Sequence, residues 1–367
     1  MKKNVFILAL ILGGAVACKK NGYNNNNNGY GNNPPPPGQV DGSFQQTNLV
    51  ADNADGGAAK TDASMVNPWG LAINPTAHII WLSSNHGGVT DVYDSTGKTL
   101  LGPIPIPSMG NPTGGSPTGV VFSPTSDFVI HATGGVAKFI FVNEDGTISA
   151  WGLGDKVTTT VADLSTLKAV YKGCALAADG GVNFLYAANF KQGKIDVFDK
   201  TFQLTSGRDF KDPNIPAGFG PFNIVNIGGM LYVTYAKLKG PDNEDDQAGP
   251  GNGYVDIYTP DGKLVKNFAS QGALNSPWGI TQAPFGSGIP TGSILVGNFG
   301  DGWINVYDAT GAYKGALQKN GQPVVIPGLW AIDFPFNEDQ TFDPGKLYFT
   351  AGPGEEGHGL FGYLKKQ

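Results

Sequence analysis

The residues of this sequence best suited to bind a metal ion are concentrated in one acidic segment. Asp242, Glu244, Asp245 and Asp246 follow one another almost without interruption. Adjacent carboxylates repel each other, and a hard cation such as Ca²⁺, which prefers carboxylate and carbonyl oxygens, relieves that repulsion. The segment lacks the Asp-x-Asp-x-Asp-Gly order of an EF-hand. It therefore predicts either a site for Ca²⁺ or another divalent ion, or a solvated acidic loop without a metal.

A second candidate for chemistry lies near the end of the sequence. Glu356 and His358 are two residues apart, and a carboxylate beside an imidazole can act as an acid/base pair or as two metal ligands. This spacing is not diagnostic of either role. We predict a part in ligand binding for both residues and assign no catalytic residue.

Polar residues recur after similar apolar runs elsewhere in the chain. Asn85 precedes His86, Asn189 stands alone, and Asn298 is followed by Asp301. These side chains could contact a ligand. Asparagine also closes turns by bonding its own backbone and tolerates left-handed geometry, so a repeated architectural role is the alternative.

Trp69, Trp278 and Cys174 complete the set of candidate residues. The two tryptophans could stack on a sugar ring, or they could seal the junctions between structural units. No histidine or basic residue that would favour a thiolate is directly adjacent to Cys174 in the sequence. We predict a buried structural thiol at this position.

Composition excludes several classes of function. The net charge is −6, and Arg208 is the only arginine, whereas a phosphate-binding surface needs clustered lysine and arginine. The sequence contains no His-Glu-x-x-His, Gly-x-Ser-x-Gly or P-loop motif. We therefore expect no nucleic-acid partner and leave catalysis open, with the balance against an enzyme.

A repeat of about 50 residues positions the candidate residues. Each copy has a small residue or proline, a bulky residue, a glycine and an aliphatic residue, with variations. The copies are Pro68-Trp69-Gly70-Leu71, Pro117-Thr118-Gly119-Val120, Tyr171-Lys172-Gly173-Cys174, Pro221-Phe222-Asn223-Ile224, Pro277-Trp278-Gly279-Ile280 and a degenerate Gly328-Leu329-Trp330-Ala331.

Four strands are predicted for each copy, because short apolar runs, alternating runs and Asp/Gly turns follow every motif. In the second copy we expect the second strand at 128–131 and the third at 138–142, which makes Glu144-Asp145-Gly146 a turn between the third and fourth strands. Four strands per copy are typical of a propeller blade. The sequence therefore predicts an all-β, six-bladed β-propeller over residues 42–367, with the last blade closed by an N-terminal strand at 44–50.

This architecture brings the candidate residues together. Loops between blades, and loops joining second and third strands, meet on one face around the mouth of the central channel. Binding sites concentrate on such loops because a rigid scaffold holds them. We expect the acidic segment, the recurring asparagines, the Glu356 region and both tryptophans on this face.

The N-terminus reads as an export signal. Lys2 and Lys3 precede a short apolar stretch that ends in Ala15-Val16-Ala17-Cys18. Small residues before a cysteine resemble a bacterial lipobox, which implies a signal peptide over 1–17 and a lipid on Cys18. Residues 18–41, rich in Asn, Gly and Pro, predict a solvated tether. We expect an exported protein anchored by its lipid to an outer membrane or cell surface.

Several segments resemble known propeller families. The run at 189–199 (NFKQGKIDVFD) is similar to repeats of the NHL and YVTN superfamily. The runs at 139–151 (FIFVNEDGTISAW), 248–258 (AGPGNGYVDIY) and 347–362 (LYFTAGPGEEGHGLFG) more closely resemble an uncharacterised family of exported bacterial six-bladed propellers. This resemblance implies the fold and export but no activity.

Three functions are compatible with these features. The first is a monomeric binding module that presents the channel mouth to a ligand, glycan or protein. The second is a metal-dependent hydrolase or lactonase that uses the same face, and the third is a structural scaffold of the cell envelope. The fold alone does not select among them.

Overall fold

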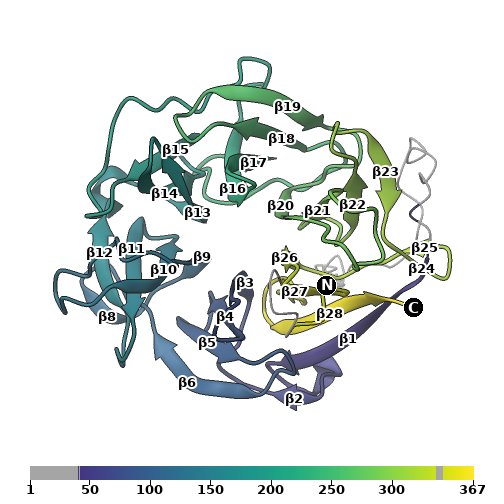
Figure 1. Ribbon diagram of the computed structural model, residues 1–367, viewed down its shortest axis with the longest axis horizontal. Coiled ribbons are helices and arrows are strands. Elements are labelled where there is room, and N and C mark those ends of the chain that lie inside the picture. Colours follow the sequence, from purple (N-terminus) through teal and green to yellow (C-terminus); the bar gives the residue numbers. More distant parts are fainter. Residues whose placement is uncertain (1–39, 41, 336–341) are drawn as a thin grey trace, which may run out of the picture. The chain divides into compact units, whose positions relative to one another are not determined.

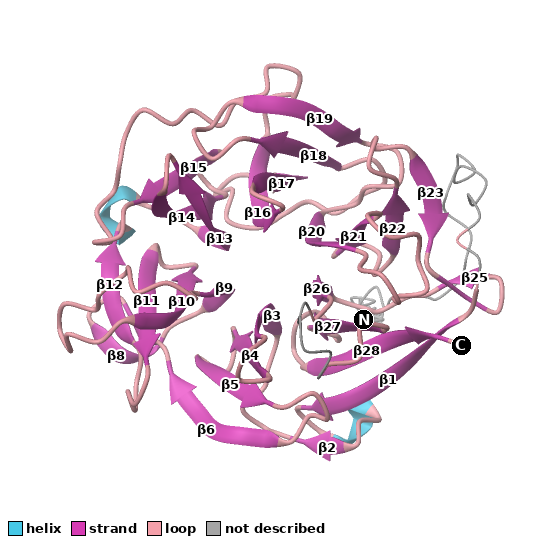
Figure 2. Ribbon diagram, in the orientation of Figure 1, coloured by secondary structure: helices cyan, strands magenta, loops and turns pink. Residues whose placement is uncertain are grey.

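The alternating segments of the sequence form a β-propeller in the computed structural model, which describes residue 40, residues 42–335 and residues 342–367. Six sheets surround a central axis, and each extends outward from an innermost strand (Figures 1 and 2). The prediction of an all-β, six-bladed propeller is confirmed. The predicted signal peptide, Cys18 and all of the predicted tether except residue 40 lie outside the described residues.

In blades 1 to 5 the innermost strand comes first in the chain, whereas in blade 6 the outer strands β1 and β2 come from the N-terminal part of the chain. In blade 3 the outermost position holds only an isolated bridge between Phe198 and Leu204. From the centre outward, the strands are β3 (Pro68–Asn74), β4 (Ile79–Ser84), β5 (Val89–Tyr93) and β6 (Thr99–Pro105) in blade 1; β9 (Pro117–Phe122), β10 (Ala137–Asn143), β11 (Thr147–Gly152) and β12 (Thr159–Asp163) in blade 2; β13 (Tyr171–Asp179), β14 (Val182–Asn189) and β15 (Lys194–Phe198) in blade 3; β16 (Phe219–Ile227), β17 (Met230–Lys237), β18 (Gly253–Tyr258) and β19 (Leu264–Ser270) in blade 4; β20 (Pro277–Gln282), β21 (Ile294–Asn298), β22 (Ile304–Tyr307) and β23 (Tyr313–Ala316) in blade 5; and β26 (Leu329–Asp333), β27 (Lys346–Ala351), β28 (Leu360–Lys366), β1 (Phe44–Ala51) and β2 (Lys60–Thr61) in blade 6.

Short elements connect or flank the blades. Within the described ranges, no helix has the length and hydrophobicity that a transmembrane span requires. The short elements are the hairpins β7 (Pro107–Ser108) with β8 (Asn111–Gly114) and β24 (Gln318–Lys319) with β25 (Gln322–Pro323), and the 3-10 helices η1 (Ala54–Gly56) and η2 (Ser165–Leu167).

The N-terminal strand closes the last blade. β1 runs antiparallel to β28, with Phe44 opposite Lys366 and Val50 opposite Phe361. This pairing covers the sheet edge that β28 would otherwise expose, and an exposed edge is a template for aggregation. The predicted closure by residues 44–50 is confirmed.

The second blade differs from its predicted strand order. The expected second strand at 128–131 is an insertion that makes only one bridge, Val129 with Val136. Phe128 and Ile130 are fully buried, so this insertion carries the apolar pattern of a strand without being one. The expected third strand is part of β10, the second strand. As a result, the turn containing Glu144 joins second and third strands and lies at the channel mouth.

The core consists of apolar layers between neighbouring blades, because both faces of every sheet are covered. Between blades 1 and 2, Trp81 stacks on Phe139 with ring centroids 4.1 Å apart, and Trp151 packs against both. Similar clusters fill the other five junctions. These layers hold the loops of the mouth on a rigid frame.

Candidate functional site

Each innermost strand carries a β-bulge close to where the chain enters the blade. In blade 1, Pro68 pairs with Ser84 while Leu71 pairs with Leu82, so a step of three residues on β3 lies opposite a step of two residues on β4. A bulge re-aims the side chain it contains. Here it turns the bulky residue of the repeat toward the axis. These residues form what we call the channel ring: Trp69, Thr118, Lys172, Phe222, Trp278 and Trp330.

The register of blade 6 corrects the predicted alignment of its repeat. Leu329 pairs with Ala351 and Ile332 with Phe349, which makes Leu329 equivalent to Pro68 and Trp330 equivalent to Trp69. The sequence interpretation placed Trp330 one position later, where the other copies have glycine or asparagine. Ala331 occupies that position instead.

The repeated glycine is required by the close approach of adjacent blades. A Cβ atom on Gly279 would lie 2.6 Å from the backbone oxygen of Trp330 in the next blade. A Cβ atom on Gly70 would lie 2.5 Å from the backbone oxygen of Thr118. Real Cβ contacts are longer than this, so only glycine fits without a backbone shift. The contact between adjacent blades therefore explains why glycine recurs at this position.

Aromatic side chains of the ring seal the axis. Trp69 and Trp330 stack with centroids 3.6 Å apart, and Phe299 stacks on the other side of Trp330 at 3.9 Å. Trp278 meets both tryptophans edge-on, at 6.4 Å and 6.0 Å. Trp69 and Trp278 are buried, which matches the sealing role that the sequence left open.

Lys172 is the charged member of the channel ring. Its side chain is only 1% exposed and forms an ion pair with Glu144 from the β10–β11 loop. Its ammonium nitrogen lies 4.8 Å from the centre of the Trp69 ring and 4.0 Å from the Asp245 carboxylate. A buried lysine requires such compensation, because an isolated ammonium in a protein interior is strongly disfavoured.

Two glutamates meet amide side chains around this lysine. The Asn85 Nδ2 donates to Glu144 Oε2 at 2.9 Å, and the Asn67 Nδ2 donates to Glu356 Oε2 at 2.7 Å. We call Asn67, Asn85, Glu144, Lys172 and Glu356 the mouth cluster. Its members come from the loops or first strands of blades 1, 2, 3 and 6.

The two carboxyl groups of the mouth cluster have opposite pKa shifts. Burial works to raise the pKa of Glu144, but the Lys172 charge and the hydrogen bonds from Lys172 and Asn85 outweigh it, so the pKa lies below its ordinary value. Burial raises the pKa of Glu356, and the bond from Asn67 offsets this only in part. The charge of Glu144 adds to the rise. The two groups therefore interact electrostatically.

The carboxylates of the acidic segment are divided among different partners. Glu244 pairs with Lys191 at 2.6 Å, Asp245 approaches Lys172, and Asp242 is exposed. Asp246 forms a backbone bridge with Leu238, and burial raises the pKa of its side chain. No group of three or more His, Cys, Asp or Glu suited to a metal occurs among the described residues. Metal binding by this segment stays a prediction.

Asn189 and Asn298 occupy equivalent buried positions at the ends of second strands, together with Asn143. Asn189 donates to Asp196 at 2.7 Å, and Asn298 donates to the backbone oxygen of Ala273 at 2.8 Å. The first bond joins the second and third strands of blade 3, and the second joins β21 to the connection between blades 4 and 5, so both asparagines have an architectural role.

Asn85 stands one residue beyond this position, next to Ser84, and its amide joins the mouth cluster. Asp301 accepts bonds from Asn275 at 3.0 Å and from Asn298 at 3.3 Å. It therefore belongs to the turn of blade 5. The three asparagines chosen from the sequence thus have two different roles.

The candidate histidines differ in position. His86 is exposed, and it lies near enough to Glu144 and Glu356 to lower the pKa of both carboxyl groups. His358 lies 3.0 Å from the Asp52 carboxylate and 2.9 Å from Asn53 through its Nδ1. Glu356 turns to Asn67 instead. The possible pairing of Glu356 with His358 is therefore replaced by two separate sets of contacts.

Cys174 is buried in the first strand of blade 3, and burial raises the pKa of its thiol. A raised thiol pKa disfavours the reactive thiolate. This agrees with the expected structural role.

The sequence interpretation missed Lys172, Glu144 and Asn67. Lys172 was visible as the one charged residue at the bulky position of the repeat. Glu144 was assigned to the wrong turn because the insertion at 128–131 shifted the strand count of blade 2. Asn67 precedes the first motif, and nothing in its sequence context distinguishes it.

Comparisons with known proteins identify relatives of this chain. A protein of Acanthamoeba polyphaga mimivirus is 37% identical over 340 residues, which cover 87% of this chain and 80% of the relative. A second protein of the same virus is 35% identical over 341 residues, covering 88% and 86%. The chain belongs to the family of these uncharacterised mimivirus proteins. No family model matches it.

Solved structures with the same fold are more distant in sequence. The soluble aldose sugar dehydrogenase of Escherichia coli has a TM-score of 0.53 and 15% identity, covering 89% of this chain and all of that one. Virginiamycin B lyase of Staphylococcus aureus has a TM-score of 0.50 and 14% identity, with coverages of 89% and 100%. At these identities the likeness shows the propeller fold alone. The resemblance to exported bacterial propellers stays a prediction.

Proposed function

We propose that this protein is a binding module whose mouth cluster recognises a ligand rich in hydrogen-bond donors, such as a glycan or an amine. One observation carries the proposal: side chains from four blades converge on two glutamates around a buried lysine. Such an arrangement is costly to build, because it desolvates charged groups. A propeller held together by apolar layers does not need it for its fold.

The charges of the cluster indicate the kind of ligand. Among the described residues, Glu144, Glu356 and Asp245 surround one ammonium group, that of Lys172. The excess of carboxylates favours donors, either sugar hydroxyls or an ammonium group. Glu144 is 29% exposed and Asp245 is 70% exposed, so a ligand can reach them from solvent. The buried Asn85 and Lys172 hold Glu144 in place before a ligand arrives.

The test is a binding screen followed by calorimetry. The protein is applied to a glycan array and titrated with spermidine, and any hit is repeated with Glu144→Gln and Glu356→Gln. We expect each variant to weaken binding by about tenfold or more, as expected for the loss of a charge-assisted bond. Asp209→Asn is the matched control, because Asp209 is 79% exposed and pairs only with the exposed Lys211 among the contacts described. Absence of any hit, or hits unaffected by both Gln variants, would overturn the proposal.

A hydrolase at the same face is the second candidate, and the opposite pKa shifts of Glu144 and Glu356 favour it. A carboxyl group with a raised pKa near one with a lowered pKa is the arrangement that general acid–base hydrolysis uses. Both solved neighbours are enzymes by name. Turnover of nitrophenyl glycosides, esters or a lactone that both Gln variants abolish would establish this function. A melting temperature that rises with Ca²⁺, Mg²⁺, Mn²⁺ or Zn²⁺ and returns to its original value with a chelator would show that the hydrolase also binds a divalent ion.

We also infer export and lipid anchoring, which rest on the sequence alone. The lipobox-like Ala15-Val16-Ala17-Cys18 follows a short apolar stretch. Expression in a bacterial host with labelled palmitate is the direct test. Label retained by Cys18→Ser, or absent from the wild-type protein, contradicts the inference.

A further inference from the structure

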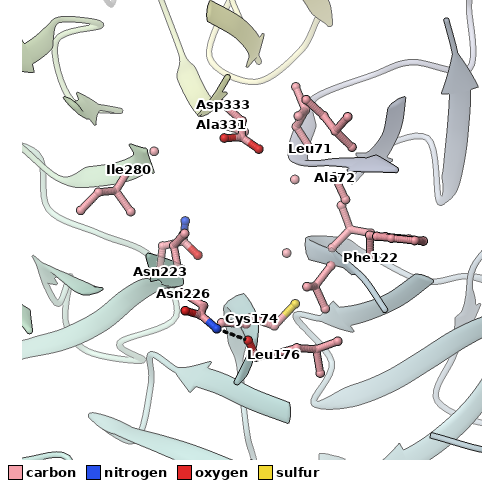
Figure 3. A pocket seen from close by; sticks show the side chains of 18 of the residues that line it. Leu71, Ala72, Phe122, Cys174, Leu176, Asn223, Asn226, Ile280, Ala331 and Asp333 are labelled. Atoms are coloured by element: carbon pink, nitrogen blue, oxygen red, sulfur yellow. Dashed lines mark hydrogen bonds between the residues drawn. The ribbon is translucent and has the colours of Figure 1, made fainter. Parts of the chain in front are cut away.

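A central cavity of about 330 Å³ lies behind the channel ring. The innermost strands of all six blades line it, starting at the glycine position of the repeat and extending to Asp333 and Asn226 (Figure 3). A volume of this size is at the lower end of the range for small-molecule pockets. Trp278 of the ring forms part of its inner end.

The cavity opens on the side of the propeller opposite to the mouth. Along β16, exposure rises from the buried Phe222 near the mouth to the exposed Asn226 at the other end. Pro124 is likewise exposed beyond the end of β9, and it lines the same opening. The sealed ring therefore separates this cavity from the mouth cluster.

Most of the wall is apolar. Figure 3 shows the side chains of Leu71, Phe122, Leu176 and Ile280 around an open centre, with Asp333 across from Asn226. An apolar wall of this kind favours a hydrophobic ligand body, because burial of apolar surface is favourable at roughly 25 cal/mol per Å².

Asp333 breaks the repeat at this wall. By strand register, it occupies the position held in the other blades by Ala72, Val121, Ala175, Val225 and Thr281. Nothing in the propeller fold requires a carboxyl group here, since five blades are built without one.

Asp333 has no positively charged neighbour among the described residues that line the cavity. Among the residues lining the cavity, all of which belong to the described ranges, Asp333 is the one charged residue. Thr281 donates to its Oδ1 at 2.9 Å. Burial raises its pKa to about 6, with the bond from Thr281 offsetting part of the rise. A carboxylate ionised at neutral pH, held in an apolar cavity without a cation, is stabilised by a cation that enters from outside.

We propose that this cavity binds a small hydrophobic amine, whose ammonium group pairs with Asp333 and whose body contacts the apolar wall. The apolar wall, the open end and the uncompensated carboxylate are three independent features of the structure that point to the same ligand. The site is separate from the mouth cluster, and it does not depend on the function proposed there.

The test compares two probes of equal shape, 2-phenylethylamine and 2-phenylethanol, by calorimetry at about pH 7.5. We expect the amine to bind the wild-type protein at least about tenfold more tightly than the alcohol. Asp333→Asn should remove this preference while keeping binding of the alcohol. Lowering the pH to about 5 should weaken amine binding to the wild-type protein by about tenfold, because Asp333 becomes protonated.

Two control variants keep the proposal falsifiable. Asn226→Trp, at the exposed rim, should block both probes without requiring a change in the core. Asp209→Asn, at an exposed position that does not line the cavity, should leave amine binding unchanged, and the block by Asn226→Trp distinguishes this site from the mouth cluster. Equal affinity for the two probes, amine binding that is insensitive to both Asp333→Asn and pH, or binding of both probes unaffected by Asn226→Trp would overturn the proposal.

Discussion

The ion pair between Lys172 and Glu144 provides a quantitative test of the mouth cluster. Removing one partner of a fully buried ion pair typically lowers stability by about 3–5 kcal/mol. In Glu144→Gln the Lys172 ammonium stays buried, but Asp245 at 4.0 Å and the Trp69 ring at 4.8 Å still compensate part of its charge. Glu144 is itself 29% exposed. We therefore expect a loss of about 2 kcal/mol in the free energy of unfolding, below the range for full burial.

A double-mutant cycle separates the pair from its surroundings. Lys172→Met removes the buried charge and leaves Glu144 partly solvated, so its effect should be smaller, about 1 kcal/mol. The double variant should be more stable than the sum of the two single changes predicts, because the isolated ammonium is then gone. Urea denaturation of the four proteins measures the coupling. Strictly additive effects would show that the two charges do not stabilise each other.

The pH dependence of the pair has a definite sign. The pKa of Glu144 in the folded protein is lower than its ordinary value of 4.5. Its stabilising contribution is therefore complete above about pH 4.5 and is lost as the pH falls through the lower folded pKa. The stability difference between the wild-type protein and Glu144→Gln should be constant from about pH 5 to 8 and shrink below it. A difference that persists unchanged in acid would refute the assignment.

Three further predictions concern the frame. Trp330→Ala should lower the free energy of unfolding by about 3–5 kcal/mol in urea titrations, since it opens a cavity in the stacked ring. Gly279→Ala should be destabilising in the same assay because its Cβ would lie 2.6 Å from a backbone oxygen, whereas Gly102→Ala, with no atom within 4 Å, should be close to neutral. Removing residues 1–38 should leave the melting temperature unchanged, while removal through β1 should lower it sharply; equal melting of the two truncations would contradict the closure.

Most of the frame was predictable from the sequence, because the blade pattern occurs in six copies and each copy supports the interpretation of the others. Six copies of the motif define the innermost strands. The last copy lacks its fourth strand and an additional strand precedes the first copy, which predicts the closure by β1. The prediction was wrong where one copy was interrupted. In blade 2, the buried Phe128 and Ile130 have the alternating apolar pattern of a strand although they lie in an insertion. The sequence alone does not show which segments pair with each other, so it could not reveal this difference.

The site was less predictable, for a physical reason. Acidic residues such as Asp242 and Glu244 are easily recognised in a sequence as candidate metal ligands, but their role depends on the partners that they contact in the structure. The mouth cluster depends on contacts between blades: Asn67 with Glu356 is 289 residues apart in the chain, and Asn85 with Glu144 is 59 apart. Such distances follow from the closed ring of blades and from the exact strand register, which pattern analysis determines only approximately.

The residues most suited to function in this propeller are those that break its repeat at positions facing the axis. At the bulky position, aromatic residues pack into a seal, and a lysine in that ring requires a carboxylate from a neighbouring loop. Three residues further along the same strands, small or apolar residues suffice in five blades, and Asp333 in the sixth introduces a charge without a cation. The frame explains neither residue, because propeller packing is satisfied by the equivalents in the other blades. Each charge is therefore explained by its partner. For Lys172 the partner is a carboxylate that shapes the mouth, and for Asp333 it is the cation of a ligand. Substituting each by the residue of a neighbouring blade, Lys172→Phe and Asp333→Thr, should preserve the fold by circular dichroism and remove only binding. If either variant binds every probe as the wild-type protein does, the charge at that position belongs to the frame after all.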